Sequence, residues 1–299
     1  MKLEGVLPFS TRNTFNHKET FAKAVDHLFP GIPRIENTHA LTAAQEILKN
    51  DSLLVVMNHS SKLDMFLAIH SLLVALDIDD TVNKSILMNE ELTRKHNPNL
   101  QAQITQNFCS LWDITPLPVF LSYKGWSSEE RKVKNSKTKQ DTLSALSEPR
   151  NIVFLFPEGN IDRIVLEAKR GLREFISAGR GYTLPVTSNF HTYLGEPVMG
   201  KMPETLVVHY PISNAELAAA SLNNEGQSAS DFVLSTVASA LPPYQRGFYT
   251  EMSSQLELEA QNTDDERIKN MKELQHVLYS YEVVPTEINH AIVDTRDKA

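Results

Sequence analysis

The chain has 299 residues, of which 41% are hydrophobic and 22% are charged, as in a globular protein that buries a large core. Its formal net charge of −8 argues against a general nucleic-acid binder, because such a protein needs a basic surface to displace counterions from phosphates. The one cysteine, Cys109, excludes an intrachain disulfide and a thiolate metal cluster, so a reducing compartment suits the chain.

The first 45 residues are predicted to form a helical N-terminal segment. Residues 14–29 place apolar side chains at helical spacing, and Pro-Gly-Ile-Pro at 30–33 ends the pattern. A second helix is predicted over 38–49, with Thr38 as its N-cap. The N-terminus has no long apolar signal-peptide core, and no apolar run approaches the ~20 residues that span a bilayer. We therefore expect a cytoplasmic protein that is soluble or at most peripheral at the inner face of a membrane.

Short apolar runs alternate with helical patterns through residues 46–250. Runs of strand length lie at 52–58, 117–122, 151–156, 183–188 and 205–211. Helices are predicted over 62–76, with Ser60 or Ser61 as N-cap, and over 138–147 and 166–178. This alternation is typical of an α/β domain with a largely parallel or mixed central sheet flanked by helices. Ligands bind such sheets at the carboxyl ends of the strands.

Two further segments complete the predicted organisation. The polar stretch 219–231 is expected to be a loop, and residues 251–299 a C-terminal helical extension with a frayed tail. The chain thus divides into a helical segment 1–45, an α/β domain 46–250 and an extension 251–299. The helix over 65–76 is apolar nearly all round and is expected to be buried, although part of it could line a groove for an acyl chain. His70 on this helix is expected to be a satisfied or semi-exposed histidine rather than a ligand.

A histidine and an aspartate follow the first predicted strand of the α/β domain. His59 comes directly after the apolar run, and Asp64 lies five positions later, about one turn into the helix. Asp64 could hold one ring nitrogen of His59 and leave the other to take a proton, as in a catalytic general base. The spacing alone is weak, since His191 with Glu196 shows it too, and on its own the pair more often means a solvated helix start.

Four pieces of the sequence, taken in order, resemble the signature of the glycerolipid acyltransferase family. That signature is N-H-x-x-x-x-D after an apolar strand, then F-P-E-G-T-R-S, then K-x-G or K-R-G, then a strand that contains proline. The resemblance covers residues 50–190. The matching pieces here are Asn58-His59 with Asp64, Phe156-Pro157-Glu158-Gly159, Lys169-Arg170-Gly171 and Leu184-Pro185-Val186.

The resemblance implies an O-acyltransferase that moves a fatty acyl group from acyl-CoA or acyl carrier protein to the hydroxyl of a glycerol phosphate or lysophospholipid. It makes His59 the general base, oriented by Asp64. Glu158 and Gly159 would line the acceptor site, where glycine lets the backbone approach a ligand closely. It implies no metal and no cofactor beyond the acyl donor as co-substrate, and Cys109 is expected to be a core residue.

Two departures from the signature concern the acceptor. Ile161 stands where the family has an arginine, and Tyr123-Lys124 stands where a second arginine is expected. Lysine cannot copy the forked contacts that arginine makes with phosphate. The acceptor therefore stays open between a phosphate-bearing lipid and a non-phosphorylated alcohol or amine, and a module that binds lipid or carrier protein without catalysis is a further alternative. The candidate cations for substrate binding are Lys124, Arg163, Lys169 and Arg170.

A local excess of positive charge lies at residues 124–139, in a chain that is acidic as a whole. Two interpretations are about equally good. The stretch is a solvated loop and helix start, or it is a surface for anionic lipid headgroups, the phosphates of CoA or an acidic carrier protein.

Overall fold

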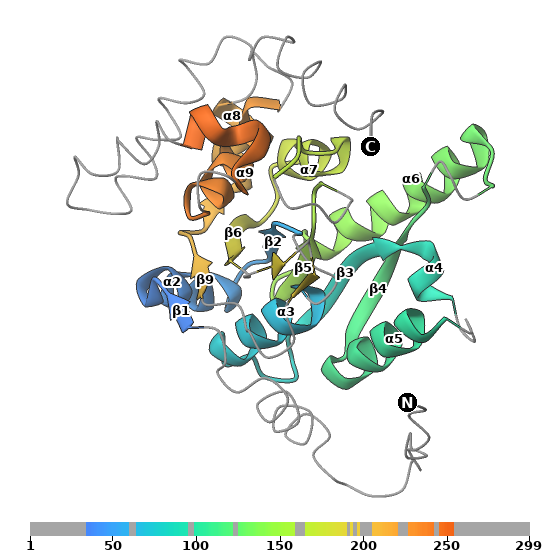
Figure 1. Ribbon diagram of the computed structural model, residues 1–299, viewed down its shortest axis with the longest axis horizontal. Coiled ribbons are helices and arrows are strands. Elements are labelled where there is room, and N and C mark those ends of the chain that lie inside the picture. Colours follow the sequence, from blue (N-terminus) through green and yellow to red (C-terminus); the bar gives the residue numbers. More distant parts are fainter. Residues whose placement is uncertain are drawn as a thin grey trace, which may run out of the picture.

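The computed structural model of the chain describes residues 34–59, 64–94, 99–121, 125–158, 165–189, 192–193, 196–197, 205–220, 227–241 and 245–253. The helix predicted over 14–29, the predicted caps Ser60 and Ser61 and nearly all of the predicted C-terminal extension lie outside these residues. An eight-stranded sheet forms the centre, with strands in the order β1, β9, β6, β2, β5, β3 and β4, and with β10 beside β6 (Figure 1).

The sheet is mixed, and its central strands are parallel. The five strands β6, β2, β5, β3 and β4 run in one direction, whereas β9 and β10 are antiparallel to β6. A separate pair of short strands, β7 with β8, lies outside this sheet. The strands are β1 (Arg34–Glu36), β2 (Leu53–Met57), β3 (Asn83–Asn89), β4 (Ile114–Val119), β5 (Asn151–Leu155), β6 (Tyr182–Asn189), β7 (Thr192–Tyr193), β8 (Glu196–Pro197), β9 (Thr205–Val208) and β10 (Ile212–Ser213).

Helices cover both faces of the sheet. One face packs against α2 (Thr38–Leu48), α3 (Asp64–Ala75) and α5 (Leu100–Trp112). The other face packs against α6 (Ser128–Ala145), α7 (Arg170–Ser177), α8 (Asn214–Ala220), α9 (Gln227–Ser239) and the short helix η3 (Gly247–Tyr249). Figure 1 shows the two groups on opposite sides of the strands, with the short helix α4 (Glu90–Thr93) after β3.

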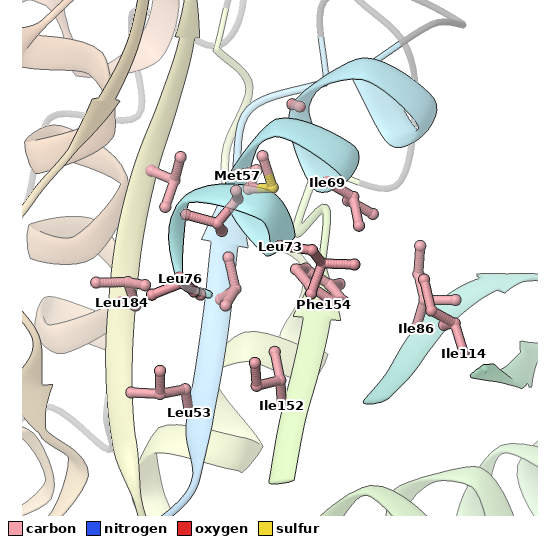
Figure 2. Close-up of a cluster of buried hydrophobic side chains, with 14 of the residues drawn as sticks. Leu53, Met57, Ile69, Leu73, Leu76, Ile86, Ile114, Ile152, Phe154 and Leu184 are labelled. Carbon is pink, nitrogen blue, oxygen red and sulfur yellow. The ribbon is translucent and has the colours of Figure 1, made fainter. Parts of the chain in front are cut away.

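Strand β2 lies at the centre of the sheet, and this position explains why its sequence is apolar throughout. Leu53, Val55 and Met57 face the layer of α3, whereas Leu54 and Val56 face the layer of α7 and α9, and all five are fully buried. Figure 2 shows Ile69 and Leu73 of α3 in the same buried cluster as Met57 of β2 and Phe154 of β5. Burying one such side chain contributes about 1.5–3 kcal/mol, so both layers hold this strand in place. The apolar helix predicted over 65–76 is thus confirmed as a core element.

The predicted fold class is confirmed, and so are most of the predicted strands. The run 117–122, however, was placed too late, because β4 is Ile114–Val119. Its sequence carries Pro116 and Pro118, which discourage a strand assignment. Within the described residues β4 pairs only with β3, so prolines are tolerated on this edge. Neither β3 nor α5 was predicted, since polar residues interrupt their apolar patterns.

The helices also differ at their ends from the prediction. Helix α6 begins ten residues before the predicted start at 138, because Ser127 and Glu130 form a capping box. The cap of α2 is Asn37 rather than Thr38, and its side chain accepts the Ala40 N–H at 3.2 Å. The predicted loop 219–231 is wrong at both ends, since α8 runs to Ala220 and α9 starts at Gln227.

Candidate active site

The turns that follow β2 and β5 leave the sheet side by side. These strands are parallel neighbours, with Val55 opposite Phe154 and Val56 opposite Leu155. Their carboxyl ends therefore meet at one edge, which is where ligands bind parallel sheets. The turn after β2 carries His59, and the turn after β5 carries Glu158. Two segments about a hundred residues apart in the sequence thus form one site.

Asn58 fixes the point where the chain leaves β2. Its side-chain nitrogen donates to the Ser188 carbonyl at 2.9 Å, and its side-chain oxygen accepts the Ser188 N–H at 2.8 Å. The Asn58 side chain is buried. The main-chain pairing of β2 with β6 ends at Met57 and Val186, and the Asn58 side chain extends the contact between the two segments beyond that point. His59 therefore starts from a backbone that is held on the β6 side.

Glu158 holds the same backbone from the β5 side. Its Oε2 accepts the His59 N–H at 3.1 Å, and its Oε1 accepts the Leu166 N–H at 3.2 Å. The residue is only 1% exposed. One buried carboxyl group therefore ties the turn after β2 to the segment that leads into α7. The His59 ring is half-buried, and its centroid lies 4.6 Å from that of the Phe156 ring.

The main chain of the segment Lys169-Arg170-Gly171 is bonded to the same turn after β5. The Lys169 N–H donates to the Pro157 carbonyl at 2.9 Å. The Lys169 side chain is exposed. The Arg170 side chain is 87% exposed and places its Nε 2.7 Å from Glu174 Oε1 on the same helix. Both candidate cations are therefore exposed, and their role in binding a substrate stays a prediction.

The structure thus brings together part of the predicted site. His59, Glu158 and the backbone of Lys169 converge on the carboxyl ends of β2 and β5. Asp64 opens helix α3, and the orienting contact predicted for its side chain stays a prediction. Gly159, Arg163 and Lys124 lie outside the described residues. Sequence reasoning missed Ser188 and Leu166 because they act through main-chain groups, which leave no mark on residue type.

Two side chains singled out in the sequence are core residues. Cys109 is buried in α5, and burial raises the pKa of its thiol to about 12. Its thiolate population at neutral pH is therefore negligible, as expected for a structural cysteine. His70 is buried on α3, with its ring centroid 5.2 Å from that of Trp112. The prediction that Cys109 belongs to the core is confirmed.

The positive charges of residues 124–139 do not gather on one face of α6. Lys134 places its ammonium 4.6 Å from the ring centroid of Trp126 and 4.9 Å from that of Phe120. Lys139 pairs with Glu174 of α7 at 3.3 Å. The first turn of the helix also carries two exposed glutamates. Within the described residues the basic stretch is therefore spread around its helix. In the same described part of the chain, no helix is long and apolar enough to cross a bilayer.

Comparisons with known proteins assign the chain to a family. A family model described as "Acyltransferase" matches residues 35–189, which is more than half of the chain and includes both turns of the site. None of the curated proteins matches the chain significantly. Among solved structures, the chain is similar to the 1-acyl-sn-glycerophosphate (LPA) acyltransferase PlsC from Thermotoga maritima. The identity is 16% and the TM-score 0.40, over 77% of this chain and 81% of that one.

Proposed function

The chain belongs to the acyltransferase family, and we propose that it transfers a fatty acyl group from acyl-CoA or acyl carrier protein to the hydroxyl of a glycerol phosphate or lysophospholipid. The observation that carries this proposal is the joint between His59 and Glu158 at the carboxyl ends of two neighbouring parallel strands. A lipid acceptor would also bring the protein to the surface of a membrane. The reaction as proposed uses no metal and no cofactor.

His59 is the proposed general base. A ring nitrogen takes the proton of the acceptor hydroxyl while the oxygen attacks the thioester carbonyl. The tetrahedral intermediate then collapses, the carbon–sulfur bond breaks, and the imidazolium returns its proton to the departing thiolate. Asp64 is the proposed orienter, which would fix the ring tautomer. No acyl-enzyme forms, in keeping with a single cysteine that is buried and protonated.

Glu158 has a positioning role in this proposal as well as a place in the acceptor site. Because its carboxylate accepts the main-chain N–H of His59, it fixes the main chain from which the imidazole extends. Gly159 follows it, and a glycine there would let the acceptor approach the backbone. Geometry held to a fraction of an ångström matters here, since small misplacements of a general base cost large factors in rate.

The acceptor phosphate would be met by lysine and arginine side chains near the K-R-G step. Lys169 and Arg170 are exposed at this edge, and Lys124 and Arg163 are the other candidates. The absence of the two family arginines favours a second candidate function, in which the same chemistry acts on a non-phosphorylated alcohol or amine. The salt bridge of Arg170 with Glu174 favours it too, because it uses part of the guanidinium.

The experiment follows release of free thiol from acyl-CoA and from acyl carrier protein, with and without acceptor. We expect release to depend on an acceptor and to fall by several orders of magnitude in His59→Ala. A panel of acceptors with and without phosphate separates the two candidate functions. Binding of lipid vesicles or carrier protein without any transfer would instead identify a non-catalytic module.

A further inference from the structure

The segment that supports Glu158 is itself held from its far side by residues near the end of the described chain. Val165 donates its N–H to the Gln245 carbonyl at 2.9 Å and accepts the Phe248 N–H at 3.0 Å. These bonds tie residues 165–168, which lead into α7, to the segment 245–249. That segment lies well beyond residues 35–189, the part of the chain that the acyltransferase family model matches.

Tyr249 makes a second, side-chain connection between the same segments. The residue is 1% exposed and packs in the core between the sheet and α9. Its hydroxyl oxygen accepts the Ala168 N–H at 3.1 Å and donates its proton to Asp231 Oδ1 on α9 at 3.2 Å. Burial and the negative charge of Asp231 raise the pKa of Tyr249 well above its usual value, so the hydroxyl remains protonated.

These contacts form a continuous path from α9 to the site. Asp231 orients the Tyr249 hydroxyl, and the hydroxyl holds Ala168 two residues after Leu166. The Leu166 N–H donates to one oxygen of Glu158, whose other oxygen accepts the His59 N–H. We infer that Tyr249 is a positioning residue for acyl transfer, which holds Glu158, and through it His59, by fixing residues 165–168. This inference rests on the proposed function.

The variant that tests it is Tyr249→Phe, which keeps the buried ring and removes only the hydroxyl. Ala168 then loses its acceptor while the two main-chain bonds of Val165 remain, so Leu166 is held less firmly and positions Glu158 less exactly. We expect kcat to fall about tenfold with the KM for the acyl donor unchanged, because none of the residues on this path is proposed to bind the donor. The matched control is Thr183→Val, which removes another buried hydroxyl, the one bonded to Asn214. Thr183 lies near the amino-terminal end of β6, away from the carboxyl ends where the site lies. It should leave kcat unchanged even if it lowers the melting temperature.

A double-variant cycle shows whether Tyr249 acts through the carboxylate. Glu158→Gln replaces one acceptor oxygen by an amide, so Tyr249→Phe should cost at most about twofold in that background. Equal factors in both backgrounds would overturn the inference, as would an unchanged kcat in Tyr249→Phe. Should Tyr249→Phe fail to fold, Asp231→Asn removes the charge that orients the hydroxyl, and a smaller loss of kcat with the same dependence on Glu158 is expected.

Amide hydrogen exchange gives a measurement that does not depend on catalysis. In Tyr249→Phe the amides of Leu166 and His59 should exchange about five- to tenfold faster, while those of β6 keep their rates. Faster exchange with no acyl transfer in the parent protein would keep the positioning path and reject the proposed function. Unchanged exchange at both amides would reject the path, whatever the activity.

Discussion

Two histidines follow strands of the same sheet, and their surroundings make them chemically different. His59 comes after β2, where the chain leaves the carboxyl edge, and its ring is half-buried against Phe156. His209 comes directly after β9, which runs antiparallel to β6, so this residue still lies beside the sheet. Its N–H donates to the Pro185 carbonyl at 3.0 Å, and its ring Nε2 lies 2.9 Å from Thr187 Oγ1.

The hydrogen bonds of His209 to β6 determine how its imidazole can act. The Thr187 hydroxyl donates to the Val237 carbonyl at 2.6 Å, so it must accept the proton of the His209 ring. Burial lowers the pKa of His209 to about 4, which makes it a poor base at neutral pH. Both rings are half-buried, so the difference lies in their contacts: the ring of His59 lies against Phe156, whereas the ring and the main chain of His209 are hydrogen-bonded to β6.

The largest expected effect tests this contrast directly. His59→Ala should lower kcat by about a thousandfold or more, because it removes the only proposed base, and should leave stability nearly unchanged. His209→Gln should lower stability and change kcat less than about threefold. Steady-state rates and urea unfolding of both variants decide the matter. Equal losses of kcat in the two variants would contradict the contrast.

The second effect concerns the side chain that sets the direction of the chain at His59. Asn58→Ala leaves the N–H and the carbonyl of Ser188 buried without their partner, so we expect a loss of about 2–4 kcal/mol in the free energy of unfolding. It should also lower kcat about tenfold or more, since His59 is no longer aligned.

The matched control for Asn58 is Ser188→Ala. Asn58 hydrogen-bonds to the main chain of Ser188, and among the described residues the buried Oγ of that serine has no hydrogen-bond partner. Its removal should therefore change stability by less than about 0.5 kcal/mol. Comparable urea midpoints for the two variants would show that the amide contact does not hold this turn.

The third effect is the pH dependence that His209 gives to stability. Its pKa is about 4 in the folded protein and near 6.5 when unfolded, so the unfolded chain takes up the proton first as the pH falls. The contribution is complete above pH 6.5 and is lost between pH 6.5 and about 4, at up to ~1.4 kcal/mol per pH unit. His209→Gln should flatten this part of a urea-midpoint profile. A parallel profile in the variant would assign the acid lability to other groups.

The parts of the fold and of the site that the sequence predicts are those marked by residue type and order. Apolar runs such as 52–58 and 151–156 mark buried parallel strands, and the order of the signature pieces places His59 and Glu158 at one edge. The bounds of β4 were not predicted, because its two prolines are compatible with a strand at the edge of the sheet, and that position is known from the tertiary structure alone. The supports at Leu166 and Ser188 escape because they are main-chain contacts between distant segments. The contacts of Tyr249 could not be predicted, because its partners are distant in sequence, in α9 and in the segment before α7.

The smallest expected effect concerns the charge at the rim of the site. Arg170 is 87% exposed, and its pair with Glu174 contributes at most about 0.5 kcal/mol, so Arg170→Ala should leave the urea midpoint unchanged. If the acceptor carries phosphate, its KM should rise about three- to tenfold, because an exposed cation gives a modest, screened attraction. Glu174→Gln is the matched control, since it releases the guanidinium and should not raise this KM. A KM that stays constant in Arg170→Ala for phosphate-bearing acceptors would move the recognition of phosphate elsewhere, whereas a rise that high salt abolishes would assign it to Arg170.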